Sequence, residues 1–175
     1  MPKFRTLCAN EIEVRVGQES QTGCSLLLYK DARCDQNILD ETVGAMNWQR
    51  FHSRENANCT VSIWDEQKNQ WIGKEDTGTE SRTEAEKGLA SDSFKRACVN
   101  WGIGRELYTS PFIWIPAEQL DYKESNGKRR IACEFFVEKI AVDSEKRVIT
   151  GLAIKKRYKG EERRVFTWVL KGADA

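Results

Sequence analysis

Residues 83–101 carry the strongest helix pattern in the sequence. Thr83 and Glu86 have the spacing of a capping box, in which two side chains satisfy backbone N–H groups at the start of a helix. Gly102 stands where a glycine commonly ends one. One apolar stripe at helical spacing contains Ala90, Phe94, Ala97, Cys98 and Trp101. Small residues on the other faces predict a helix that packs closely on more than one side.

Strand patterns surround this helix. Residues 57–64 and 71–79, joined by a polar turn, predict a β-hairpin directly before it. Further upstream, the pattern predicts two strands and a short helix ending at Gly44, over residues 11–16, 24–30 and 35–44. After the long helix, a three-stranded antiparallel meander is predicted over residues 131–142, 147–157 and 163–170.

These elements predict an α+β fold, with an antiparallel β-sheet (a β-β-β-α core) packed on one long helix and an added C-terminal antiparallel β-meander. We expect residues 1–122 to form the core. Residues 123–175 are then a basic extension that packs on the core or follows it.

Charge is segregated along the chain although its net value is only +1. Residues 1–122 carry 14 Lys/Arg and 19 Asp/Glu, a net charge of −5, whereas residues 123–171 carry 14 Lys/Arg and 7 Asp/Glu, a net charge of +7. A basic face can bind phosphates even on a nearly neutral chain. A solvated basic surface without any partner explains the same asymmetry.

Catalytic motifs are lacking. The single histidine, His52, has no nucleophile elbow nearby, and the sequence contains no phosphate-binding loop. The six cysteines are irregularly spaced, which argues against a zinc site and favours free thiols in a reducing compartment. We therefore expect a protein that is not an enzyme and needs neither metal nor cofactor.

Three basic clusters are candidate phosphate contacts. Lys95 and Arg96 lie about 100° and 200° from Phe94 around the long helix, away from its apolar stripe. They could hold phosphates, or Asp92 could pair with them on a merely solvated face. The other two clusters, in a polar loop and in the meander, are Lys128, Arg129 and Arg130, and Lys155, Lys156 and Arg157.

Residues 85–108 resemble the helix signature of the Rad52-type (Rad52/Rad22) single-strand annealing proteins, and the short phage and prophage versions look most similar. The matching residues are the run Asp92-x-x-Lys95-Arg96-Ala97, then Trp101-Gly102 and Leu107-Tyr108. Upstream, residues 11–16, Gly44-x-x-x-Trp48 and Asp76-Thr77-Gly78 are also similar to that family. The resemblance covers roughly residues 11–115, and the meander lies outside it.

The resemblance implies a subunit that assembles into a ring or filament, with single-stranded DNA in a positive groove. Lys95 and Arg96 match groove positions, and Lys87 matches a third basic position although it falls within about 20° of Phe94, on the apolar side. Arg33 corresponds only approximately to a family arginine. One further family cation is replaced here by Val99.

The expected function is therefore single-stranded DNA binding and ATP-independent annealing of complementary strands, in homologous recombination or DNA repair. A single-strand-binding protein or a recombinase is the expected partner. With no apolar segment of membrane-spanning length, the expected location is the cytoplasm of a bacterial host or phage-infected cell. Two alternatives are an accessory protein that protects or delivers strands without annealing them, and an interaction protein that keeps only the fold.

Overall fold

The computed structural model describes residues 2–79 and 85–172, and for residues 85–87 it describes the backbone alone. The chain forms two compact units. Unit 1 consists of Met1–Thr6 and Lys30–Arg105, and unit 2 consists of Leu7–Tyr29 and Glu106–Ala175. Helices and antiparallel sheets both occur, which confirms the predicted α+β class.

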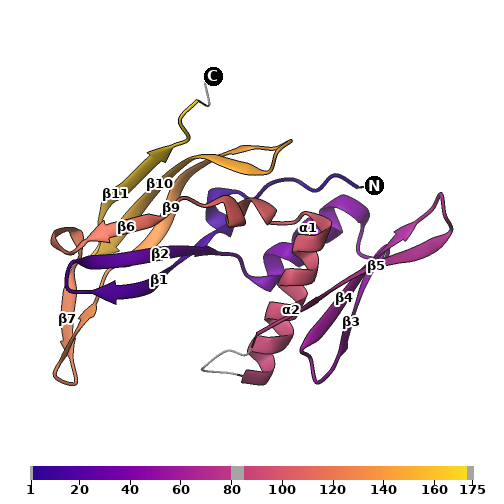
Figure 1. Ribbon diagram of the computed structural model, residues 1–175, viewed down its shortest axis with the longest axis horizontal. Helices are drawn as coiled ribbons and strands as arrows, with labels where there is room; N and C mark the ends of the chain where they lie inside the picture. Colours follow the sequence, from indigo (N-terminus) through magenta and orange to yellow (C-terminus); the bar gives the residue numbers. More distant parts are fainter. Residues whose placement is uncertain (1, 80–84, 173–175) are drawn as a thin grey trace. The chain divides into compact units, whose positions relative to one another are not determined.

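Unit 1 contains a three-stranded antiparallel sheet and two helices (Figure 1). In chain order these are α1 (Ala32–Val43), β3 (Trp48–Ser53), β4 (Asn58–Asp65), β5 (Gln70–Thr77) and α2 (Ala85–Trp101). The strand order is β3-β4-β5, α2 packs on β4 and β5, and α1 contacts both α2 and β3. Strand β3 was not predicted from the sequence.

Period-two alternation in β4 creates the face that holds α2. Cys59, Val61 and Ile63 are buried on this face, opposite the apolar stripe of the helix. Within that stripe Phe94, Ala97 and Cys98 are fully buried, and Trp101 nearly so, as the helical spacing predicts. The indole Nε1 of Trp101 donates to the carbonyl of Val61 at 2.9 Å, so the ring is buried without an unpaired polar atom.

The helix ends follow local signals. Asp31 is the N-cap of α1 and accepts a hydrogen bond from the backbone N–H of Cys34. Gly44 ends α1, as predicted. Gly102 follows α2 with φ of 102°, a left-handed backbone conformation that suits glycine. The predicted capping residue Thr83 lies outside the described residues.

Unit 2 is built on a six-stranded sheet in the order β11-β10-β9-β1-β2-β6, with a separate β7-β8 hairpin. The strand bounds are β1 (Glu13–Ser20), β2 (Gly23–Tyr29), β6 (Ile113–Pro116), β7 (Tyr122–Ser125), β8 (Lys128–Ile131), β9 (Glu134–Asp143), β10 (Val148–Tyr158) and β11 (Glu161–Val169). Three short 3-10 helices are η1 (Ala9–Glu11), η2 (Arg105–Thr109) and η3 (Ala117–Gln119).

The last three strands share their sheet with the first two. β9 pairs antiparallel with β1 through Glu13 and Phe136, and also with β10, which pairs with β11. The core of this unit contains buried apolar residues of β2, β6, β9 and β10, among them Leu26, Ile113, Val137, Ile149 and Ile154. The expected division at residue 122 into an annealing core and an extension concerns function, and it stays a prediction.

One local prediction was wrong. Lys128, Arg129 and Arg130 were expected in a polar loop, but they lie in strand β8, which pairs with β7. The strand forms because a tight turn joins β7 to β8, in which Asn126 and Gly127 have φ of 52° and 69°. Two successive residues with positive φ make the tight turn that matches the twist of a hairpin, and Asn-Gly is its strongest sequence signal.

Across residues 2–79 and 85–172, no helix is long and apolar enough to cross a membrane.

Candidate nucleic-acid interface

Lys95 and Arg96 are neighbours on α2, but their side chains have different surroundings. Lys95 is half-buried, and its Nζ makes no hydrogen bond or ion pair with any residue that the structure describes. Arg96 is exposed, and its Nε lies 3.3 Å from Oδ1 of Asp76 at the end of β5. Among its described side chains, α2 therefore offers the Lys95 ammonium group, which no described residue pairs with, and the Arg96 guanidinium group, which Asp76 holds.

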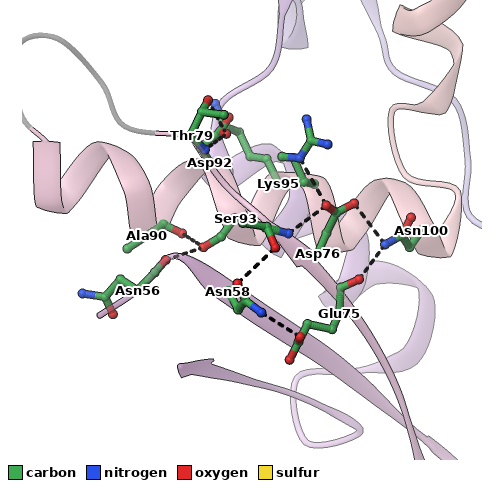
Figure 2. A network of polar contacts seen from close by, with 12 residues as sticks. Asn56, Asn58, Glu75, Asp76, Thr79, Ala90, Asp92, Ser93, Lys95 and Asn100 are labelled. Atoms are coloured by element: carbon green, nitrogen blue, oxygen red, sulfur yellow. Dashed lines mark hydrogen bonds and ion pairs between the residues drawn. The ribbon is translucent and has the colours of Figure 1, made fainter. Parts of the chain in front are cut away.

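A polar network fixes the end of β5 against α2, as Figure 2 shows. Asp76 uses its second carboxylate oxygen to accept from Nδ2 of Asn100 at 3.2 Å, and Asn100 also donates to the carbonyl of Glu75 at 3.0 Å. Glu75 in turn accepts from Asn58 at 2.8 Å. Because these contacts hold Asp76 in place, they also fix the position of the Arg96 guanidinium.

Asp92 was one alternative partner for the helix cations, and the structure gives it another role. Its Oδ2 accepts from the backbone N–H of Thr79 at 2.9 Å and lies 3.3 Å from the Thr79 hydroxyl (Figure 2). The carboxylate thereby anchors the chain just after β5 to the middle of α2. An acid of the family-like motif thus serves to position the helix.

Gly78 allows the strand and the helix to approach this closely. A Cβ at this position would lie 2.6 Å from the backbone N of Ser93 and 2.9 Å from the carbonyl of Leu89. No side chain can occupy that space without moving the backbone of one element. Gly78 also donates its own N–H to the carbonyl of Ala57 at 2.7 Å.

A buried ion pair lies beneath Lys95. Lys30 Nζ contacts both carboxylate oxygens of Asp35 at 2.5 Å and also lies 3.4 Å from the backbone carbonyl of Lys95. Burial raises the pKa of Asp35 to about 6, while the positive charges of Lys30 and Lys95 act in the opposite direction. The pair therefore connects the first turn of α1 to the backbone of α2 at Lys95.

Arg33 and Lys87 remain less defined than the two central cations. The Arg33 side chain is 85% exposed and pairs with Asp31 at 3.1 Å. Burial opposes ionisation of Asp31, but hydrogen bonds from Cys34 and Arg33 lower its pKa overall. Arg33 lies about 200° from Asp35 around α1, and no described contact joins its side chain to Lys95 or Arg96. The backbone of Lys87 is in α2, and its side chain lies outside the described residues.

The structure adds two cations that the sequence did not single out. Arg50 of β3 and Lys74 of β5 are both register partners of Val61, so they share the sheet face that meets α2. The Arg50 guanidinium lies 4.9 Å from the centre of the Phe94 ring, and Lys74 Nζ lies 4.5 Å from that of Trp101. Strand alternation around Val61 is the signal that could have placed them.

The other two basic clusters both lie in unit 2, and they differ in whether their cations form ion pairs. In the meander, Lys155, Lys156 and Arg157 all form ion pairs, with Glu138, Asp121 and Glu162 among their partners. In contrast, Lys128, Arg129 and Arg130 of β8 are exposed and form no ion pair with any described residue. Neutralised cations have little charge to offer a phosphate, so only the β8 cluster remains a candidate.

His52 and the five buried cysteines contribute to packing in the described structure. His52 is half-buried in β3, and its Nδ1 lies 3.5 Å from the hydroxyl of Ser93. Burial, and then the nearby charge of Arg50, lower its pKa below the ordinary value. All six cysteines are free, and only Cys8 is exposed. No three His, Cys, Asp or Glu side chains gather into a possible metal site within the described ranges.

Two basic features make this α+β protein a candidate for nucleic-acid binding. One is the pair of cations that α2 presents in unit 1, and the other is the β7-β8 hairpin of unit 2. Residues 5–127 match the family described as Rad52/22 family double-strand break repair protein, and the chain belongs to this family. The predicted resemblance is thereby confirmed, and recombination and repair are the roles that this family indicates. Neither the search of curated proteins nor that of solved structures found a match.

Proposed function

We propose that this protein binds single-stranded DNA and anneals complementary strands without ATP. The observation that carries the proposal is the pair Lys95 and Arg96 on α2, in which the Lys95 ammonium group makes no ion pair with a residue that the structure describes. Family membership supports a role in DNA repair and recombination. Phosphate contacts of this kind hold a strand by charge and release its counterions, so they need no cofactor.

We take β3, β4, β5 and α2 as the β-β-β-α core of the annealing module. The cations of α2 would hold the backbone of the strand and leave its bases free to test a second strand. Pairing of the two strands then supplies the free energy of annealing. Arg33 and Lys87 are further proposed contacts of the same groove, and the subunit is proposed to assemble into a ring or filament.

The test is annealing of two labelled complementary oligonucleotides without ATP. The wild-type protein should accelerate annealing, and Lys95→Ala with Arg96→Ala should abolish the acceleration. A matched control is Lys68→Ala with Lys146→Ala, which removes two exposed cations elsewhere on the chain. Circular dichroism checks the fold of each variant, because Arg96 also contacts Asp76.

Other outcomes would change the assignment. Salt-sensitive binding without acceleration would overturn annealing in favour of an accessory protein that protects or delivers strands. No binding at low salt would leave an interaction protein that shares only the family fold. If the alanine variants unfold, Lys95→Gln with Arg96→Gln keeps the side chains polar and tests the charge alone.

A further inference from the structure

The β7-β8 hairpin presents two chemically different faces. Lys123 is paired with Arg130 and Ser125 with Lys128 across the two strands. Because side chains alternate along a strand, Lys123, Lys128 and Arg130 share one face. Tyr122, Glu124, Arg129 and Ile131 share the other. The basic run Lys128-Arg129-Arg130 is therefore split between the two faces.

The three cations of the first face are exposed, and none of them forms an ion pair with a residue that the structure describes. Cross-strand and diagonal neighbours on a hairpin lie roughly 5–8 Å apart. Like charges at such separations destabilise a bare hairpin. Such a cluster is therefore favourable where an anion binds across it.

Arg129 differs from its two neighbours in the run. Its guanidinium carbon lies 3.6 Å from the centre of the Tyr122 ring, so it stacks on the opposite face of the hairpin. This contact gives Arg129 an aromatic partner, and among the described residues Lys128 and Arg130 have no such contact. It also provides a natural control, because Arg129 carries the same charge in the same strand.

The basic face continues into a hollow within unit 2. An open hollow of about 360 Å³ is lined by Lys123, Arg157, Lys159 and Glu134, among others. Arg157 is neutralised by Glu162, whereas Lys159 forms no ion pair within the described part of the chain and lies 5.2 Å from the Tyr158 ring centre. Lys123 therefore belongs both to the hairpin face and to the hollow, and Figure 1 shows the hairpin projecting from one end of the six-stranded sheet.

We propose that the Lys123, Lys128 and Arg130 face of the β7-β8 hairpin, in unit 2, also binds the phosphate backbone of single-stranded DNA, through residues other than the α2 cations. Lys159 extends this site into the hollow. The inference rests on the proposed function for the identity of the ligand. It goes further by assigning unit 2 a strand-binding surface of its own, with Arg129 outside it.

The test measures binding of a fluorescein-labelled oligothymidylate to the full chain over a series of salt concentrations. Each lost phosphate contact makes the slope of log K against log salt less steep, reducing its magnitude by about 0.7 for a single strand. The triple variant Lys123→Gln, Lys128→Gln and Arg130→Gln should therefore reduce this magnitude by roughly two. Lys159→Gln should lower it by about 0.7, and Arg129→Gln should leave it unchanged.

Two controls separate a site from general charge. Lys68→Gln, Lys146→Gln and Arg163→Gln remove the same charge from exposed, ion-paired positions and should keep the wild-type slope. Lys123→Arg, Lys128→Arg and Arg130→Lys keep the charge and should bind like the wild type. Thermal melting tests the fold of the glutamine variants, and single substitutions replace the triple variant if it melts early.

The α2 variant Lys95→Ala with Arg96→Ala is measured in the same assay. A normal slope for the hairpin triple, with loss in the α2 variant, overturns the hairpin site and leaves the proposed function intact. Loss in the hairpin triple alone supports the hairpin site and overturns the role proposed for α2. An equal loss in Arg129→Gln or in the charge-matched control overturns the face-specific site.

Discussion

Lys30 and Asp35 form a buried ion pair in unit 1, and both side chains are at most 5% exposed. Lys30 directly follows β2, and Asp35 lies in the first turn of α1. The Lys30 ammonium group also contacts the backbone carbonyl of Lys95 in α2. Burying two charges costs several kcal/mol for each ion, which their attraction offsets only while both are present. The stability of this corner of unit 1 therefore depends on keeping the pair complete.

Lys30→Met should destabilise the protein at neutral pH by about 3–5 kcal/mol, because it leaves the Asp35 carboxylate buried without its cation. Urea unfolding measures the change. The double variant Lys30→Met with Asp35→Leu should regain most of the loss, since it removes both charges from the apolar site. A double variant no more stable than Lys30→Met would show that packing around Lys30, and not the unpaired charge, determines the cost.

The same variant should lose stability in a pH-dependent way. Burial raises the pKa of Asp35 from 3.8 to about 6 in the wild type. The stability that the protonated Asp35 carboxyl contributes to the folded state is therefore complete below pH 3.8 and is lost as the pH rises through about 6. Lys30 acts to lower this pKa, so its removal should raise it further and extend the loss to higher pH.

The free energy of unfolding of Lys30→Met should accordingly approach that of the wild type as the pH falls, and the gap should widen above about 6. Urea titrations of both proteins at several pH values measure this gap. Lys30→Met with Asp35→Leu serves as the control, because it lacks the titrating carboxyl. Two curves that stay parallel across the range would show that Asp35 does not titrate differently in the variant.

Local signals predicted the parts of the fold whose cause lies within a few residues. The apolar stripe of α2, the glycines that end α1 and α2, and the hairpin that became β4 and β5 are of this kind. The pairing of β1 with β9 joins residues far apart in sequence, so no local pattern determines it. Strands β7 and β8 were missed for another reason: the Asn126-Gly127 turn was present but was interpreted as a loop.

The candidate site divides in the same way. Helical spacing placed Lys95 and Arg96 on the surface of α2, and the structure finds both accessible to different degrees. Helical spacing alone could not show that Asp76, rather than Asp92, contacts Arg96, because that contact depends on how β5 packs against the helix. Nor could the sequence distinguish the β8 cations, which form no ion pair with a described residue, from the neutralised cations of β10. Ion pairs across a sheet depend on strand register.

Gly78→Ala should destabilise unit 1 by about 1–3 kcal/mol, the typical cost of overpacking a close contact. The new Cβ would lie 2.6 Å from the backbone N of Ser93, so β5 and α2 must move apart. Chemical denaturation measures the loss. Gly151→Ala is the matched control, since its Cβ would meet only an ordinary contact at 3.4 Å.

Equal stability of the two glycine variants would mean that the approach of β5 to α2 is not limited by Gly78.

Asp76→Asn should tighten binding of single-stranded DNA by up to about fivefold, because an exposed ion pair that competes with a phosphate is worth roughly 0.2–1 kcal/mol. The carboxylate contacts Arg96 at 3.3 Å, whereas an asparagine keeps an oxygen for Arg96 and removes only the negative charge. Fluorescence anisotropy with a labelled oligothymidylate measures the affinity. Asp65→Asn makes the same charge change at the last residue of β4, beside Lys68, and should have little effect. Weaker binding by Asp76→Asn, to the extent seen on removal of Arg96 itself, would instead show that the charge of Asp76 is required to orient the guanidinium towards the strand.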